Sequence, residues 1–418
     1  MVIARSLGPA AKGGADLIVA TAGLLAMVLG LSLQSGVVYV VARGRAIISG
    51  LLLRLALVAL MQTMLAAGLL VALVRIDLSS ALLPPASEQW AVAAVALFVL
   101  GNLLAGHVRG ILLGLQHIPR VNMIGLYGQA LVLAMILIAA VLALVRGQRM
   151  TTSELVWIQV GGALALVLLL LRALRPSLTG SIQQESGFRE VLAYSLPSYL
   201  ANVVQFLNYR LDIFFVSFFV GIAGVGLYTL AVGIAQLLWL VSGAASQVLL
   251  PNVAASTDRG AAQQRTARIS RLSLWLSMVL AIGVLLVGDA LLPLVFGAAF
   301  RESVQALLWL LPGVVVFSVA NVIGSYLAGI GKPHLNLAVA LVGLVATIAL
   351  DFALIPWWGI VGAAVASSVS YLVTTAAIVA LFVRETRLPA VSTLLLTGDD
   401  LTLIVATMRR MVRVPRAT

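Results

Sequence analysis

The chain contains no cysteine and few charged residues, and both shortages exclude whole classes of protein. Without cysteine there is no disulfide and no thiolate ligand for a metal ion. Charged residues make up 10% of the 418 residues, whereas a soluble domain averages about 25%. Apolar residues make up 62%. This balance predicts an integral membrane protein with little chain outside the bilayer.

Two motifs of common enzyme classes are also missing from the sequence. It contains no G-x-x-x-x-G-K-[ST] segment, which would cradle nucleotide phosphates, and no H-E-x-x-H segment, which would bind zinc. The connections between the apolar segments are too short to hold the carboxylate or metal site of a membrane-bound glycosyltransferase or polymerase. We therefore expect no enzymatic activity and no cofactor, with a proton or sodium gradient as the energy source open to such a protein.

Long apolar segments account for most of the chain. A helix needs about 20 mostly apolar residues to cross a bilayer. Eleven segments meet this requirement: 17–42, 47–74, 90–116, 121–145, 154–174, 192–219, 224–252, 271–288, 303–330, 334–355 and 359–383. The predicted fold class is an all-α polytopic membrane protein.

Lysine and arginine predict the orientation of these spans, because cytoplasmic connections collect them. Of the 26 basic residues, 18 lie in alternate connections and in the C-terminal tail, whereas 6 lie in the other set of connections. This bias places the C-terminus in the cytoplasm. It also makes the net charge of +12 a topology signal rather than a nucleic-acid footprint.

The sequence contains an internal duplication. The segment LGPAAKGGADLIVATAGLLAMVLG aligns without gaps with VGIAGVGLYTLAVGIAQLLWLVSG, and the alignment pairs Gly13 with Gly226 at an offset of 213 residues. Residues 112–122 and 327–336 match at nearly the same offset. The repeat unit therefore contains six spans, and its two copies have the same orientation, one of the arrangements expected of transporters.

The duplication divides the chain into two predicted lobes and a tail. The C-terminal lobe, 187–383, contains all six spans of its copy, whereas the N-terminal lobe, 1–178, contains five. We therefore expect that a first transmembrane helix is missing from the N-terminal lobe, with a natural eleven-span protein as the alternative. The tail, 384–418, is predicted to form a cytoplasmic amphipathic basic helix at the membrane interface, capped by Asp399 or Asp400; a disordered tail is the alternative.

Polar residues form a stripe along the predicted span 192–219: Ser198, Asn202, Gln205, Asn208 and Asp212. Their spacing places them in an arc of about 120° on a helix. Polar side chains are unfavourable in hydrocarbon, so the stripe favours a watery cavity, with helix–helix hydrogen bonding as the alternative. Arg210 lies about 80° outside the arc. It either curls into the cavity or pairs with a neighbouring helix.

Three further basic residues lie toward the cytoplasmic ends of predicted spans. Arg54 belongs to the span 47–74, and His107 and Arg109 belong to the span 90–116. Guanidinium groups can bind phosphate through two parallel hydrogen bonds, so these residues predict an anion site near the inner leaflet. The alternative is that the arginines extend to the inner interface without binding a ligand.

The segment LAYSLPSYLANVVQFLNYRLDIFFVSFFVGIAGVGLYTLAVGIAQLLWLVSGAASQVLLPNVAA (192–255) resembles the start of the second lobe of polysaccharide (O-antigen type) flippases. These belong to the multidrug/oligosaccharidyl-lipid/polysaccharide transporter superfamily. LPLVFGAAFRESVQALLWLLPGVV (292–315) and GIVGAAVASSVSYL (359–372) resemble later segments of the family, and ARSLGPAAKGG (4–14) resembles the connection after its first helix. The resemblance implies two six-helix lobes around a V-shaped cavity.

The resemblance also implies a function and roles for residues. Family members move polyprenyl-pyrophosphate-linked oligosaccharides to the outer leaflet of the bacterial cytoplasmic membrane, for O-antigen, capsule or exopolysaccharide synthesis. Arg210 and Asp212 match the R-x-D position of the family's seventh helix, so Asp212 is the expected cation-coupling residue. The expected substrate-binding residues are Arg54, Arg109, His107 and Arg210 for the pyrophosphate, and Asn202, Gln205 and Asn208 for the sugars.

Two related functions stay open as alternatives. One is a lipid II flippase, and the other is a cation-coupled multidrug antiporter of the same superfamily. An antiporter for organic cations needs a cavity dominated by carboxylates, whereas the first-lobe spans contain no acidic residue well inside the membrane. The expected partners are the lipid-linked oligosaccharide, membrane lipids, a polysaccharide polymerase and a chain-length regulator; no nucleic acid is expected.

Overall fold

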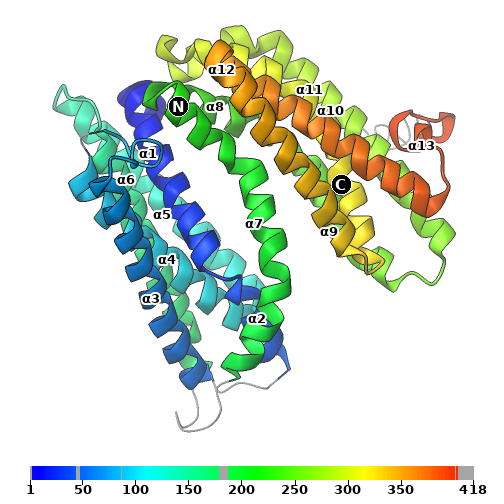
Figure 1. Cartoon of the computed structure of the whole chain (residues 1–418), viewed down its shortest axis with the longest axis horizontal. Helices are drawn as coiled ribbons and strands as arrows, with labels where there is room; N and C mark the ends of the chain where they lie inside the picture. Colours follow the sequence, from blue (N-terminus) through cyan, green and yellow to red (C-terminus); the bar gives the residue numbers. More distant parts are fainter. Residues whose placement is uncertain (1, 44–47, 86, 178–186, 401, 403–418) are drawn as a thin grey trace, which may run out of the picture. The chain divides into compact units, whose positions relative to one another are not determined.

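The computed structural model describes residues 2–43, 48–85, 87–177, 187–400 and 402, and the regular elements of these residues are all helical. This confirms the predicted all-α class. The helices are α1 Val2–Leu29, α2 Leu33–Ala42, α3 Ile48–Arg75, α4 Glu88–Gly114, α5 Ile118–Val145, α6 Thr152–Leu174, α7 Phe188–Phe219, α8 Ile222–Gln236, α9 Trp239–Ala255, α10 Arg259–Phe296, α11 Glu302–Gly329, α12 Pro333–Thr386 and α13 Val391–Leu394 (Figure 1).

Many of these helices could cross a membrane. Within the described residues, eight are long and apolar enough, or nine if the bent pair α8 and α9 counts as one span. The helix α12 counts once, although Gly359 interrupts it with a φ of 57° and a ψ of −134°. Glycine adopts this backbone without strain. The two predicted spans 334–355 and 359–383 therefore lie on either side of a kink. These features confirm a multi-pass membrane protein.

The first predicted span, 17–42, is not one helix. The helix α1 ends at Leu29, and α2 begins at Leu33. Between them Leu31 has a φ of 49° and Ser32 a φ of 51°, so both are in the left-handed region. Such residues end a right-handed helix, because the hydrogen-bond ladder cannot continue through them. At the start of α2 the backbone N–H groups of Leu33 and Ser35 donate within turns, to the carbonyl oxygens of Gly30 at 3.1 Å and Ser32 at 3.0 Å.

The chain forms two compact units. The first contains residues 1–229 and 293–300, and the second contains residues 230–292 and 301–418. The helix α7 thus groups with the first unit, because it packs on α1 and α2, whereas the sequence assigned it to the second lobe. The two lobes predicted between residues 178 and 187 follow the sequence duplication rather than these contacts, and that division stays a prediction.

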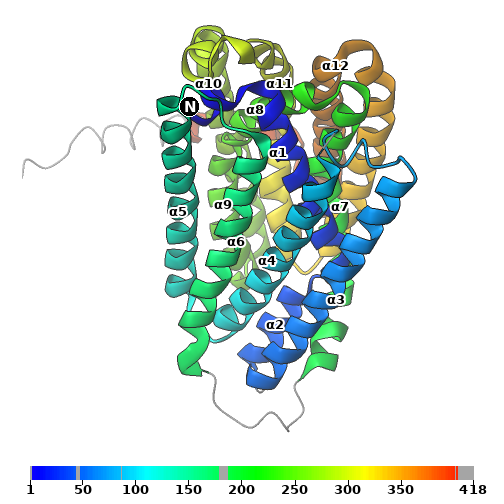
Figure 2. The ribbon, with the colours of Figure 1, turned by 90° about the vertical axis from the view of Figure 1, so that its left-hand side faces the viewer.

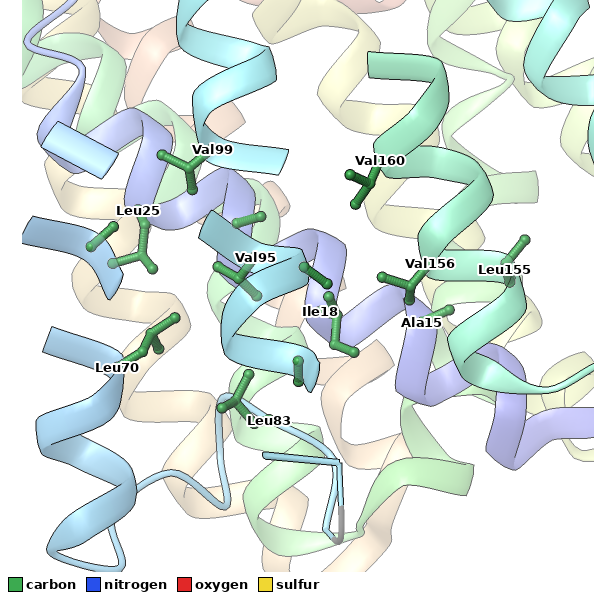
Figure 3. Packing of buried hydrophobic residues seen from close by; sticks show 14 of the residues in the cluster. Ala15, Ile18, Leu25, Leu70, Leu83, Val95, Val99, Leu155, Val156 and Val160 are labelled. Carbon is green, nitrogen blue, oxygen red and sulfur yellow. The ribbon is translucent and has the colours of Figure 1, made fainter. Parts of the chain in front are cut away.

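In the first unit, α4 packs against α3 and α6, and α6 packs against α5 (Figure 2). Side chains of α1, α3, α4 and α6 interdigitate in one buried cluster (Figure 3). Ile18 of α1, Val95 of α4 and Val156 of α6 each expose at most 1% of their surface. Because lipid tails are as apolar as these side chains, close packing rather than removal from water holds such helices together.

The start of α8 crosses α1 at unusually short range, also within the first unit. A Cβ atom at Gly13 would overlap the carbonyl oxygen of Ile222, and a Cβ atom at Gly226 would overlap the carbonyl oxygen of Pro9. Both contacts join residues of the two sequence copies. Gly13 and Gly226 are themselves paired at the offset of 213, as are Pro9 and Ile222, so the crossing is symmetric about the duplication.

In the second unit, α11 lies between α9 and α12 and is largely buried. A ring cluster joins the three helices: Trp239 lies 5.2 Å from Phe317 and 5.5 Å from Tyr371, measured between ring centroids. The indole N–H of Trp239 donates to the carbonyl oxygen of Val314 at 3.1 Å. A polar indole group inside an apolar helix bundle is thereby satisfied.

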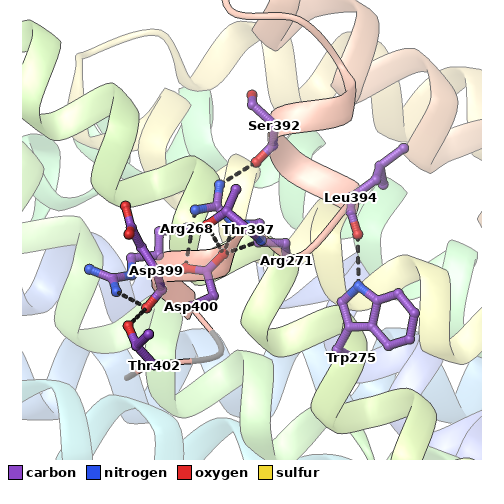
Figure 4. A network of polar contacts seen from close by, with 9 residues as sticks. All are labelled: Arg268, Arg271, Trp275, Ser392, Leu394, Thr397, Asp399, Asp400 and Thr402. Carbon is purple, nitrogen blue, oxygen red and sulfur yellow. Dashed lines mark hydrogen bonds and ion pairs between the residues drawn. The ribbon is translucent and has the colours of Figure 1, made fainter. Parts of the chain in front are cut away.

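Residues 391–400 form a strap that lies along α10 in the second unit (Figure 4). The carboxylate of Asp400 is fully buried and accepts hydrogen bonds from Arg268, Arg271 and Thr397. Asp400 thus binds two arginines of α10. Residues 398–400 and 402 are helical, so Asp399 and Asp400 lie inside this turn of helix rather than capping it as predicted. The rest of the predicted amphipathic helix lies outside the described residues.

Candidate functional site

A cavity of about 590 Å³ lies in the first unit, between α1, α2, α4 and α7. Apolar residues such as Phe98 and Phe206 form part of its wall. Its polar lining residues are Lys12, Asp16, Ser32, Gln34, Ser35, Asn102, His107, Asn202, Arg210 and Thr229. Of the four helices, α1 and α4 are candidate membrane spans. A polar cavity beside such helices is a functional-site candidate, because polar groups are unfavourable in hydrocarbon.

The helix α7 contributes Asn202, Phe206, Arg210 and Ile213 to the wall. These positions are spaced by 4, 4 and 3 residues, so they share one face of the helix. Arg210 therefore lies at the cavity, which answers the question that the sequence left open. The face differs from the predicted polar stripe, and of the stripe's members whose side chains the structure describes, only Asn202 lines the cavity.

The other members of the stripe have different surroundings. Gln205 is exposed and hydrogen-bonds Tyr209, and Asn208 donates to the carbonyl oxygen of Val204 at 3.1 Å. The carboxylate of Asp212 is buried and accepts from the hydroxyl of Tyr228 at 2.5 Å. The side chain of Ser198 lies outside the described residues. Arg210 and Asp212 thus occupy different environments, as expected for residues two apart on a helix.

The break between α1 and α2 shapes one part of the cavity. The amide of Asn202 donates to the hydroxyl of Ser32 at 2.9 Å, so α7 is tied to the break. His107 of α4 lines the same cavity and exposes only 2% of its surface. Within the described part of the chain, its Nδ1 atom has no hydrogen-bond partner. A helix N-terminus carries partial positive charge, so this region can receive an anion.

A second polar group at the cavity joins α1 to α8. The ammonium group of Lys12 contacts the carboxylate of Asp16 and donates to the hydroxyl of Thr229 at 2.8 Å. Thr229 in turn donates to Asp16. The sequence did not indicate these residues, because Asp16 lies just before the predicted span 17–42. In the structure the apolar span is Leu7–Leu29 and contains Asp16, so the expectation that the first-lobe spans hold no acidic residue was wrong. The duplication could have indicated them, since Asp16 and Thr229 are also 213 residues apart.

The structure does not bring the remaining predicted residues to this cavity. Arg109 lines a second cavity of about 490 Å³ between α4, α5 and α6, together with Gln129 and Gln159. The Nε atom of Arg109 is buried and has no hydrogen-bond partner among the described residues. Arg54 lies on the exposed face of α3, outside the lining of both cavities.

The sequence predicts that Arg54 binds the substrate, whereas the structure places it outside both cavities, and a variant can distinguish the two. We expect Arg54→Ala to change transport less than about twofold, since an exposed arginine near a membrane interface contributes little. Uptake or flipping of a labelled substrate in vesicles that contain the variant measures this. If Arg54→Ala lost as much transport as Arg210→Ala, Arg54 would belong to the binding site as the sequence predicted.

Comparisons with known proteins agree with the resemblance inferred from the sequence. Residues 120–305 match a family described as polysaccharide biosynthesis protein. A probable low-salt glycan biosynthesis flippase, Agl15 of Haloferax volcanii, is 29% identical over 191 residues, which cover 45% of this chain and 40% of that protein. The capsular polysaccharide biosynthesis protein CapF of Staphylococcus aureus is 25% identical over 194 residues, or 44% and 48% of the two chains. The chain spans less than half the length of these curated relatives.

Solved structures show the fold. The lipid II flippase MurJ in an inward closed conformation has a TM-score of 0.75 at 13% identity, with 100% of this chain and 90% of that chain covered. An inward-facing multidrug resistance transporter of the MATE family and MOP superfamily has a TM-score of 0.72 at 14% identity, with 92% of each chain covered. The protein therefore has the fold of MOP superfamily transporters.

Proposed function

We propose that the protein is a flippase that moves polyprenyl-pyrophosphate-linked oligosaccharides across the cytoplasmic membrane for the synthesis of cell-surface polysaccharide. The observation that carries this proposal is the cavity of the first unit. It gathers the guanidinium of Arg210, the buried imidazole of His107 and the start of α2 around one space. One sequence relative is named a probable glycan biosynthesis flippase and the other a capsular polysaccharide biosynthesis protein, and both names support the same conclusion.

The chemistry of such a cavity is binding rather than catalysis. A pyrophosphate carries negative charges that a guanidinium group can bind through two parallel hydrogen bonds. The imidazole of His107 can donate to a remaining oxygen, and the partial positive charge at the start of α2 favours an anion there. The amide of Asn202 and the hydroxyls of Ser32 and Ser35 suit the many hydroxyl groups of a sugar. Exposure of this site to each side of the membrane in turn would move the lipid headgroup.

The charge balance of the cavity favours an anionic cargo over an organic cation. Asp16 is the acidic residue among its lining side chains, and it is paired with Lys12. The pair is close to neutral, whereas Arg210 adds a positive charge. This favours the lipid-linked oligosaccharide over the substrate of a multidrug antiporter.

The remaining parts of the proposal concern energy supply, partners and location. A proton or sodium gradient would reset the carrier, with Asp212 as the coupling carboxylate. A polysaccharide polymerase and a chain-length regulator would act on the translocated lipid. The protein would lie in the inner membrane, and the excess of basic residues in alternate connections supports a C-terminus on its cytoplasmic side.

Deletion of the gene tests the proposed function. We expect lipid-linked oligosaccharide to accumulate in the inner leaflet, and the wild-type gene to clear it. The variant Arg210→Ala is expected to transport at least about tenfold less, because a hydrogen bond to a charged group contributes about 1.5–3 kcal/mol. Arg120→Ala is the matched control, since Arg120 is exposed at the start of α5.

Three results would contradict the proposal. Accumulation of no lipid intermediate, in a strain without a second flippase, would remove the cargo assignment. Export of cationic drugs that depends on Asp16 would instead favour the antiporter. Equal transport by Arg210→Ala and Arg120→Ala would show that the cavity is not the binding site.

A further inference from the structure

A ring stack lies where α2 meets α7 in the first unit. The rings of Tyr39 and Tyr194 are nearly parallel, with an interplanar angle of 14° and centroids 4.0 Å apart. The guanidinium carbon of Arg43 lies 4.3 Å from the centroid of Tyr39. Two groups this close to one ring must occupy its opposite faces. Tyr39 is thus enclosed between a cation and a second ring.

The stack continues the wall of the cavity along these two helices. Ser32 of α2 bonds Asn202 of α7 at the cavity. One turn further along α2, Gly36 lies against Val191 and Ser195, so tightly that a Cβ atom would overlap the Val191 carbonyl oxygen. Tyr39 then follows Ser35, a lining residue, by about one helical turn, or about 6 Å.

The ring of Tyr194, the outer member of the stack, is accessible to a ligand. Tyr194 exposes 44% of its surface although Tyr39 covers one ring face. Its orientation is fixed by a stack that already includes a cation, so little side-chain freedom remains to be lost when a ligand binds. A fixed aromatic face beside a polar cavity suits a ligand with a flat C–H face and polar edges. A pyranose ring has this shape, and its polarised C–H groups face the negative side of the ring quadrupole.

We propose that the Tyr39–Tyr194 stack is a sugar-binding platform, which holds one pyranose ring of the cargo against Tyr194 while the pyrophosphate lies in the cavity. This inference rests on the proposed function and extends it, since it places a glycan-recognition subsite beyond the anion site. Arg43 acts as a positioning residue, because it orders Tyr39 from the face opposite the sugar.

The test uses the full chain in lipid nanodiscs and two soluble probes that differ by one sugar. Farnesyl pyrophosphate reports the anion site, and farnesyl-pyrophosphoryl N-acetylglucosamine reports both sites. We expect Tyr194→Ala to weaken binding of the sugar-bearing probe about fivefold, the effect of one aromatic contact, and to leave farnesyl pyrophosphate unchanged. Tyr194→Phe should bind both probes as the wild type does, because it keeps the ring.

A matched control is Tyr127→Ala, since Tyr127 is 61% exposed on α5 and lies outside both cavities. Equal weakening of both probes by Tyr194→Ala would overturn the platform and assign the stack a structural role. Unchanged binding of both probes would also overturn it, while the flippase proposal would stand. If wild-type protein fails to bind farnesyl pyrophosphate, or if Arg210→Ala does not weaken that binding, the proposed function itself fails.

Discussion

Replacement of Gly13 by alanine is expected to lower the stability of the protein, although the change adds a single methyl group. The new Cβ atom would overlap the carbonyl oxygen of Ile222 in α8. Neither group can rotate away, because both positions are set by backbone, so the two helices must separate. Overpacking of this kind costs about 1–3 kcal/mol, and more where backbone has to move.

Thermal unfolding in detergent, followed by fluorescence-detected gel filtration, measures the effect of Gly13→Ala. The matched control is Gly68→Ala on α3, where a Cβ atom would meet nothing within 4 Å. This control should be neutral or slightly stabilising, since alanine favours a helix by about 1 kcal/mol over glycine. The melting temperature should therefore fall in Gly13→Ala and stay the same or rise in Gly68→Ala. The same melting temperature for both variants would contradict the close crossing of α1 and α8.

The symmetry of the crossing extends this prediction to a pair of variants. Gly226→Ala should be as harmful as Gly13→Ala, because Gly226 meets the carbonyl oxygen of Pro9 in the same way. The double variant should lose less stability than the sum of the two. Once the helices have separated for one methyl group, the second finds part of the space already open.

The fold class could be predicted from the sequence because it depends on quantities that add along the chain. Long apolar runs and the bias of basic residues define membrane spans regardless of which helices touch. The break at Leu31 and Ser32 could not be predicted in this way. Neither residue favours the left-handed region, and Gly30 is one glycine among 37. Tertiary contacts such as the hydrogen bond from Asn202 to Ser32 accompany the break.

The residues of the candidate site could likewise be predicted from the sequence only in part. The predicted stripe on α7 consists of polar residues alone, yet the wall of the cavity includes Phe206 and Ile213 and excludes Gln205. Periodicity gives the angle of a residue around its own helix, but not the direction in which the neighbouring helices lie. The position of Asp16 was accessible through the duplication, since its partner Thr229 is its own equivalent in the second copy.

The variant Arg271→Ala is expected to release the C-terminal strap from α10. Arg271 donates through Nε to Asp400 at 2.5 Å and through Nη1 to the carbonyl oxygen of Ser392 at 2.6 Å. Its loss leaves a fully buried carboxylate with Arg268 as its remaining cation. The loss of hydrogen bonds between charged groups costs about 1.5–3 kcal/mol. These bonds join the strap to α10, so we expect the strap to detach rather than the whole unit to unfold.

Hydrogen exchange of the backbone of residues 391–400 measures this release. Protection should fall by about tenfold or more in Arg271→Ala, corresponding to at least about 1.5 kcal/mol. The matched control is Arg265→Ala, one of the exposed arginines in the same part of α10. Protection that is equal in the two variants would show that the strap is held by its backbone contacts, such as the bond from Trp275 to the carbonyl oxygen of Leu394.

Acid should release the strap of the wild-type protein in the same way. Hydrogen bonding from Arg271, aided by Thr397, holds the pKa of the Asp400 carboxyl well below its usual value of 3.8. A carboxylate whose pKa is lower in the docked state stabilises docking at every pH above its usual value. That contribution is lost as the pH falls below about 4, because the undocked strap then binds the proton more readily.

Exchange should therefore be constant from pH 8 to pH 5, after correction for its intrinsic rate, and strap protection should fall only below that range. In Arg271→Ala this acid step should be greatly reduced, since the group that lowers the pKa of Asp400 is gone; a full step in that variant would assign the pH dependence to another carboxyl.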